Sequence, residues 1–222
     1  MNATATADEE PREPILSPVE RVSEMLFGLF MAVTFVGAMS AATPEAEIRS
    51  MFVAALGCNL AWGLVDGVMY VVRSLTERGR VLSLALAVRA APDAEAGRGH
   101  VERALSKVAA KLVSPTEVEA IRARIVALPS LPQRPRVTGE DLLAGVGIFF
   151  IVVAATFPVV LPFALIDHVG MAKIVSRVVT LAMLFVGGLA LGRYAGFGSL
   201  KTGFMMAALG VVVIAAIMAL GG

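Results

Sequence analysis

The stretch LLAGVGIFFIVVAATFPVVLPFALI, residues 142–166, decides the fold. It runs for 25 residues without a charged side chain, and about 20 residues of α-helix are enough to cross the hydrocarbon core of a bilayer. An open sheet would leave backbone groups unpaired in lipid, so a helix is the expected conformation. The stretch therefore predicts a transmembrane helix.

Similar apolar runs lie on both sides of this one. The whole chain is 57% hydrophobic and 17% charged, with a mean hydropathy of +0.80, whereas soluble domains average about 25% charged residues. We therefore predict an all-α polytopic membrane protein with five transmembrane helices and the lipid bilayer as its main partner. The five expected spans are residues 25–42, 51–72, 142–166, 174–191 and 204–220.

The distribution of lysine and arginine predicts the orientation. Sixteen of the nineteen lie on one side if the N-terminus is cytoplasmic, so the positive-inside rule predicts N-in, C-out. Long loops count for less in this rule, and without residues 73–138 the margin is four against three. The expected organisation is a disordered cytoplasmic N-terminus (1–20), transmembrane helices 1 and 2 (21–72), a small cytoplasmic helical insert (73–138) and transmembrane helices 3 to 5 (139–222).

The insert has helical patterns of its own. Val101, Leu105, Val108 and Leu112 recur at helical spacing and predict one amphipathic helix. The sequence 114–117, Ser-Pro-Thr-Glu, predicts a capped start for a second helix. The second apolar stripe is Val118, Ile121, Ile125 and Leu128. Both stripes need a partner, which can be the membrane surface, the rest of the protein or a second subunit.

The second span, LGCNLAWGLVDGVMYVV (56–72), carries the most informative polar residues. Asn59 and Asp66 are seven residues apart, nearly two helical turns, and so share a face. An acid inside a span costs roughly 2.5 to 3.5 kcal/mol on insertion scales, and such residues mark cation or proton pathways. The structural alternative is a neutral Asp66 hydrogen-bonded to another helix, with Asn59 joining helices in the same way.

Other residues are candidates for a cation site or for close helix packing. Glu24 begins the first span and could lie at a cytoplasmic entrance, although the helix dipole also explains an acid there. Met31 and Met69 offer thioether sulfur to a soft metal, although methionine in a membrane helix is more often a packing residue. Two glycine pairs, Gly63/Gly67 and Gly188/Gly192, fit close helix–helix contacts.

Pro158 and Pro162 lie four residues apart in the third span. Each proline removes a backbone hydrogen bond and crowds the carbonyl four residues earlier, so this helix should bend or break. Broken helices near the membrane midplane are a recurrent feature of transporters. The two prolines therefore favour a translocation path beside this helix.

Several classes of function are not indicated. The chain has no nucleophile elbow, phosphate-binding loop, zinc-protease motif or dinucleotide fingerprint, so we expect neither an enzyme nor a bound cofactor. The single cysteine, Cys58, excludes an internal disulfide. The net charge of +1 gives no reason to expect a nucleic-acid partner. Arginine outnumbers lysine fifteen to four, which favours a bacterial genome rich in GC and hence the cytoplasmic (inner) membrane.

The layout resembles the vacuolar iron transporter family. The paired prolines in ATFPVVLPF, the closing helical pair from Thr180 onward, and the opening RVSEMLFGLFMAV all look like segments of that family. The resemblance implies five membrane helices with a cytoplasmic insert after the second. It also implies a homodimer whose path runs at the subunit interface, between the first two helices of each protomer, so that two Asp66 residues could face each other.

The metal-binding residues depart from the family pattern. In this register the family's first-helix aspartate falls on Met31, and its second-helix glutamate has no clear counterpart. The family's insert carries a glutamate-rich metal-gathering cluster, whereas this insert has scattered acids among twelve basic residues. Hard divalent cations prefer several oxygen ligands, and one helix pair does not supply them.

The sequence as a whole favours a proton-coupled antiporter that exports a divalent cation of the iron or manganese class. One alternative is the same scaffold carrying a different substrate. The other is a non-transporting membrane protein whose basic insert recruits a protein partner or anionic lipid.

Overall fold

The computed structural model describes residues 15–42 and 48–219, with side chains described in 15–37 and 52–219. Throughout these residues the regular structure is helical, and no strand occurs in them. Most of the N-terminal segment predicted to be disordered lies outside the described residues. The helices are α1 (Pro18–Ala42), α2 (Ile48–Ala90), α3 (Ala94–Ala104), α4 (Ala109–Leu112), α5 (Pro115–Ala127), α6 (Gly139–Val160), α7 (Pro162–Leu165), α8 (Val169–Ala195) and α9 (Ser199–Ala219).

Among the described residues, four helical segments are long and apolar enough to cross a bilayer, which makes the chain an integral membrane protein. They are Phe52–Ala90, Gly139–Val160, Val169–Ala195 and Ser199–Ala219. These segments match four of the expected spans. The other expected span lies in α1, whose side chains are described only as far as Gly37. The number five therefore stays a prediction.

The chain forms two compact units, which we describe separately. The bundle unit is the part of the chain up to Val68 and from Leu143 onward, and the insert unit is Met69–Leu142. Because α2 and α6 cross these boundaries, each helix contributes to both units.

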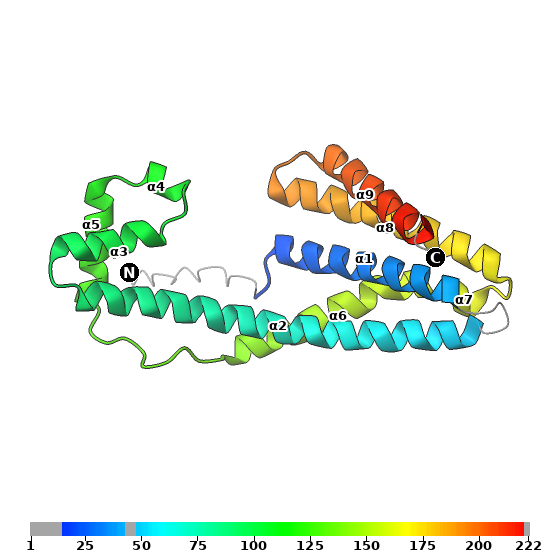
Figure 1. Cartoon of the computed structure of the whole chain (residues 1–222), viewed down its shortest axis with the longest axis horizontal. Helices are drawn as coiled ribbons and strands as arrows, with labels where there is room; N and C mark the ends of the chain where they lie inside the picture. Colours follow the sequence, from blue (N-terminus) through cyan, green and yellow to red (C-terminus); the bar gives the residue numbers. More distant parts are fainter. Residues whose placement is uncertain (1–14, 43–47, 220–222) are drawn as a thin grey trace, which may run out of the picture. The chain divides into compact units, whose positions relative to one another are not determined.

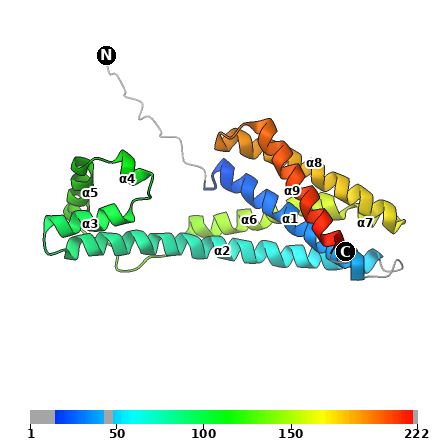
Figure 2. The same cartoon turned by 45° about the horizontal axis from the view of Figure 1, so that its top comes forward.

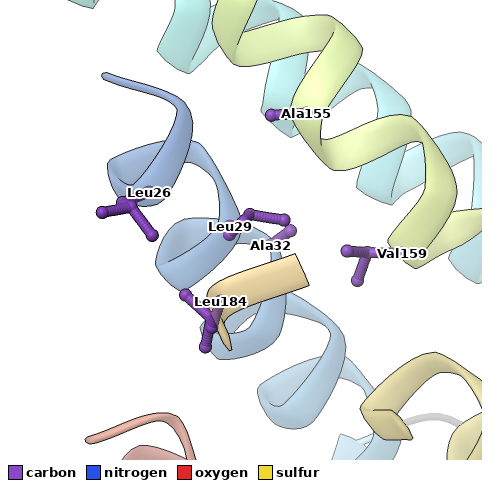
Figure 3. Close-up of a cluster of buried hydrophobic side chains, with 6 residues drawn as sticks. All are labelled: Leu26, Leu29, Ala32, Ala155, Val159 and Leu184. Carbon is purple, nitrogen blue, oxygen red and sulfur yellow. The ribbon is translucent and has the colours of Figure 1, made fainter. Parts of the chain in front are cut away.

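The core of the bundle unit is formed by α1, α6 and α8. Figure 3 shows its six central residues, Leu26, Leu29, Ala32, Ala155, Val159 and Leu184. Of these, Leu29, Val159 and Leu184 are fully buried. Helices α8 and α9 form a hairpin that packs against α1 (Figure 1). The hairpin turns at Gly196 and Gly198, whose φ angles of 74° and 84° suit glycine because it lacks a Cβ.

The insert unit is built on the C-terminal half of α2, which corrects one prediction. The second helix was expected to end at Val72, but it continues to Ala90. Val88 of this extension packs with Val101 of α3 and Val118 of α5, and all three are buried (Figure 2 shows the three helices). The extension is helical because packing against α3 and α5 buries one of its faces.

The prediction that the first amphipathic stripe of the insert forms a single helix was also wrong. Helix α3 ends at Ala104, with Leu105 as an extended C-cap, and a separate short helix α4 follows. Val101 is buried, whereas Val108 and Leu112 are 70% and 77% exposed. The apolar spacing was helical, but the core of this unit has room for only the first part of the stripe.

The second helix of the insert begins as predicted. The Ser114 side chain accepts a hydrogen bond from the Glu117 backbone N–H, and Glu117 accepts one from the backbone N–H of Ser114 at 2.7 Å. Pro115 occupies the first turn, so the predicted capping box is confirmed. Of its predicted stripe, Val118 is buried and Ile125 is partly buried, while Ile121 and Leu128 are exposed.

Candidate functional site

The candidate site lies on the face of α2 that packs against α6 in the bundle unit. A Cβ added to Gly67 would lie 2.5 Å from the Gly145 carbonyl oxygen, and one added to Gly63 would lie 3.2 Å from the Phe149 carbonyl oxygen. The two helices are therefore in close backbone contact along these glycines. The contact predicted for Gly63/Gly67 is confirmed, and it places Asn59, which precedes Gly63 by one turn, on the same side of α2.

Asn59 lines a small cavity between α1, α2 and α6. Its side chain is 8% exposed, and its Nδ2 atom has no hydrogen-bond partner among the described residues. The cavity volume is ≈ 10 Å³, close to the minimum that a single water molecule needs. Met31 lines the same cavity, so the structure brings two of the predicted ligands together. The other walls include Cys58, Trp62, Thr156 and Val160.

Asp66 follows Asn59 by seven residues on α2, about 10 Å along the helix axis. The residue is half-buried, but its Oδ2 atom is buried and has no hydrogen-bond partner among the described residues. Asp66 does not line the Asn59 cavity. The face of α2 that meets α6 thus carries two separated polar atoms with unused bonding capacity.

The remaining predicted ligands are not gathered at this cavity. Glu24 is half-buried on α1, and Met69 is exposed on α2. In the part of the chain that the structure describes, no three His, Cys, Asp or Glu side chains are close enough to hold a metal ion together. Asn59 and Asp66 offer one amide and one carboxylate, which suit the transient binding of a proton or cation better than a closed metal cage.

The two prolines break the third span as predicted. Helix α6 contains Pro158 and ends at Val160, and α7 starts at Pro162. Ser176 of α8 donates a hydrogen bond of 2.6 Å from its hydroxyl to the Val159 carbonyl, and both residues are buried. A backbone carbonyl beside the break is therefore satisfied by a side chain rather than by a water-filled path. The sequence analysis did not single out Ser176, because only the fold brings it to residue 159.

Ion pairs organise the insert unit. Arg78 makes a bidentate contact with the buried carboxylate of Asp141, including a bond of 2.8 Å from Nη2 to Oδ1. Asp141 Oδ2 also accepts a hydrogen bond of 2.7 Å from the Thr138 backbone N–H. This pair, in which Asp141 is buried and Arg78 is exposed, links α2 to the start of α6.

A second cluster joins α3 to α5. Arg122 Nη2 lies 2.6 Å from Glu119 Oε1, and Arg98 Nη1 lies 3.3 Å from Glu119 Oε2. Hydrogen bonding from Arg122, assisted by Arg98, lowers the pKa of Glu119 to about 2, although partial burial opposes this shift. Glu119 is therefore occupied in structural contacts, which does not favour a metal-gathering role for it.

No protein-family model matches the chain, and the search of curated proteins finds no match either.

Proposed function

We propose that the protein is a proton-coupled antiporter that exports a divalent cation of the iron or manganese class, with Asp66 as the coupling acid. The observation that carries the proposal is the buried Asp66 Oδ2 atom, an acceptor that has no hydrogen-bond partner among the described residues, on the face of α2 that meets α6. An unpaired polar group inside a membrane helix is unfavourable. A proton or a cation that arrives at Asp66 would relieve this cost, and exchange of one for the other couples their movements.

Each candidate residue has a defined role in this proposal. Asp66 supplies the charge at one point of the path, and about 10 Å away along α2 the amide oxygen of Asn59 would supply a neutral ligand at a second point. Met31 shares the Asn59 cavity and would provide a soft ligand. The described residues of one protomer offer too few clustered oxygen ligands for a hard cation. The proposal therefore includes a homodimer in which two copies of Asp66 contribute, as the resemblance to vacuolar iron transporters implies.

The proposed topology follows from the charge distribution. It has five spans, with α1 as the first, a cytoplasmic N-terminus and a cytoplasmic insert between the second and third spans. The proposed location is the bacterial cytoplasmic membrane. Glu24, in the N-terminal half of α1, would then lie toward the cytoplasmic end of the bundle.

Transport can be tested in vesicles that contain the purified protein. An imposed proton gradient should drive uptake of Fe²⁺ or Mn²⁺, measured with a metal-quenched dye, together with opposite proton flow, measured with a pH dye. If neither cation moves, the proposed substrate class is wrong, and flux of another solute would favour the alternative substrate.

The role of Asp66 has its own test. We expect Asp66→Asn to lower the cation flux by more than about tenfold, since it removes the charge that binds the cation. The matched control is Asp167→Asn, because Asp167 is exposed between α7 and α8, and its flux should equal that of the unchanged protein. Equal flux in both variants would contradict the coupling role of Asp66 but would not contradict transport by the protein.

A further inference from the structure

Helix α8 carries two cations near its start that face the inside of the bundle unit. Lys173 and Arg177 are four residues apart and so lie on one side of the helix. Together with Ser176 they line a cavity between α1, α8 and α9. The other walls are apolar or small: Val33, Val36, Gly37, Ile214 and Ile217.

Among the described residues that line this cavity, Lys173 and Arg177 carry positive charge and none is an acid. Lys173 already takes part in an interaction of its own, so the need for a ligand rests on Arg177. Arg177 is half-buried, and within the described part of the chain it forms no hydrogen bond or ion pair. A cation in a membrane helix is unfavourable without an opposite charge. The Ser176 hydroxyl already donates its hydrogen bond to the Val159 carbonyl, so Ser176 lines the cavity but has no donor left for a ligand. These features call for an anion beside Arg177.

The size of the cavity limits which part of an anion can enter. Its volume is ≈ 20 Å³, which is room for about one water-sized group. A single phosphate oxygen fits this space, whereas a whole phosphate or sugar headgroup does not. The anion must therefore place one oxygen in the cavity and leave the rest of the molecule outside.

The surface next to the two cations is apolar. Met171, Ile174 and Val178 of α8 are more than half exposed and lie close in sequence to Lys173 and Arg177. On a helix that spans the membrane, such side chains contact acyl chains. A ligand that combines a phosphate with an acyl chain would match both the cations and this surface, and a phospholipid has that composition.

We propose that Lys173 and Arg177 bind the phosphate of an anionic phospholipid, with one phosphate oxygen in the cavity and an acyl chain along Ile174 and Val178. This site is separate from the Asn59 cavity and from Asp66. It does not depend on the proposed transport activity.

The test measures thermal unfolding of the full-length purified protein in detergent. The probes are a short-chain phosphatidylglycerol, a phosphatidylcholine with the same chains, and inorganic phosphate. We expect phosphatidylglycerol to raise the Tm by about 3 °C at ten times its Kd, with no comparable rise from the other two. The double variant Lys173→Gln/Arg177→Gln should lose this rise. The control Arg193→Gln/Lys201→Gln, which changes two exposed cations, should keep it.

In the unfolding measurement, three results would overturn the proposal. An equal rise with phosphatidylcholine would show that charge is not recognised. An equal rise with inorganic phosphate would assign the site to a free anion instead of a lipid. A full rise in the double variant would place lipid binding elsewhere. If the double variant does not fold, Arg177→Gln alone is compared with the unchanged protein by native mass spectrometry, and equal retention of phosphatidylglycerol would again overturn the assignment.

Discussion

At the scale of single residues, two glycines of α2 lie in different surroundings. Gly67 lies directly against the backbone of α6, whereas Gly57, on the same helix, has no atom of the described residues within 4 Å of an added Cβ. Glycine normally lowers helix stability by about 1 kcal/mol relative to alanine. Its presence at position 67 is explained by the close contact, while the structure shows no contact that requires it at position 57.

This difference gives a matched pair of substitutions. Gly67→Ala should lower the free energy of unfolding by about 1–3 kcal/mol, because the new methyl group would lie 2.5 Å from the Gly145 carbonyl oxygen and the helices would have to separate. Gly57→Ala should leave stability unchanged or raise it by up to about 1 kcal/mol. Thermal unfolding in one detergent measures both. A similar response at the two positions would contradict the close approach of α2 and α6.

Only some of the residues of the candidate site could be recognised from the sequence. Asn59 and Asp66 were recognisable because amides and acids are rare in apolar spans. Thr156 and Cys58, which share the Asn59 cavity, gave no comparable signal. Threonine and cysteine are common in buried helices, so neither residue type marks a site, and only the packing of α2 against α6 identifies Thr156 as a neighbour of the amide.

At the scale of elements, α3 and α5 are held together by apolar contacts and by one carboxylate. Val101 and Val118 pack together beside Val88. Glu119 forms ion pairs with Arg98 of α3 and with Arg122 of its own helix. The ion pairs are partly exposed, so the apolar contacts supply most of the stability of this arrangement. The ion pairs make the stability of this arrangement depend on pH.

Acid should loosen α5 from α3 through Glu119. Its pKa is lowered to about 2 in the folded chain, so the ionised form contributes stability above the ordinary glutamate pKa, and this contribution is lost as pH falls from about 4 to 2. Hydrogen exchange of the α5 amides, corrected for the intrinsic rate, should show falling protection across this window. Glu119→Gln should flatten the response. Unchanged pH dependence in that variant would contradict the assignment to Glu119.

At the scale of the whole molecule, the division into two units predicts separable stability. The core of the insert unit centres on Val88, Val101 and Val118, while the core of the bundle unit centres on α1, α6 and α8. Among the described residues, the two cores have no member in common. Helices α2 and α6 belong to both units, but the buried side chains that stabilise each unit are distinct.

A charge in the insert core should therefore act locally. Val101→Asp buries a carboxylate among apolar side chains and should unfold the insert unit, because Val101 is only 2% exposed. Hydrogen exchange should accelerate in α3 and α5 and remain slow in α8 and α9. The control Val108→Asp places the same charge on a residue that is 70% exposed and should leave exchange unchanged. Faster exchange in α8 and α9 after Val101→Asp would show that the two units unfold together.

The sequence by itself determined the features that depend on local pattern. Apolar runs of sufficient length predicted the membrane helices, the Ser114–Glu117 spacing predicted a capped helix, and Pro158 and Pro162 predicted a break. Each follows from rules that act within about one helical turn or along a single span. These predictions agree with the structure because no distant contact is needed to satisfy them.

Only the tertiary structure decided where α2 ends, which half of the α3–α4 stripe is buried, and which helices surround Asn59 and Arg177. Helical periodicity states which residues share a face but does not say what covers that face. Packing against α3 and α5 extends α2 to Ala90, and packing of α8 with α1 and α9 turns two ordinary cations into the walls of a cavity. The physical reason is that burial is a property of contacts between elements.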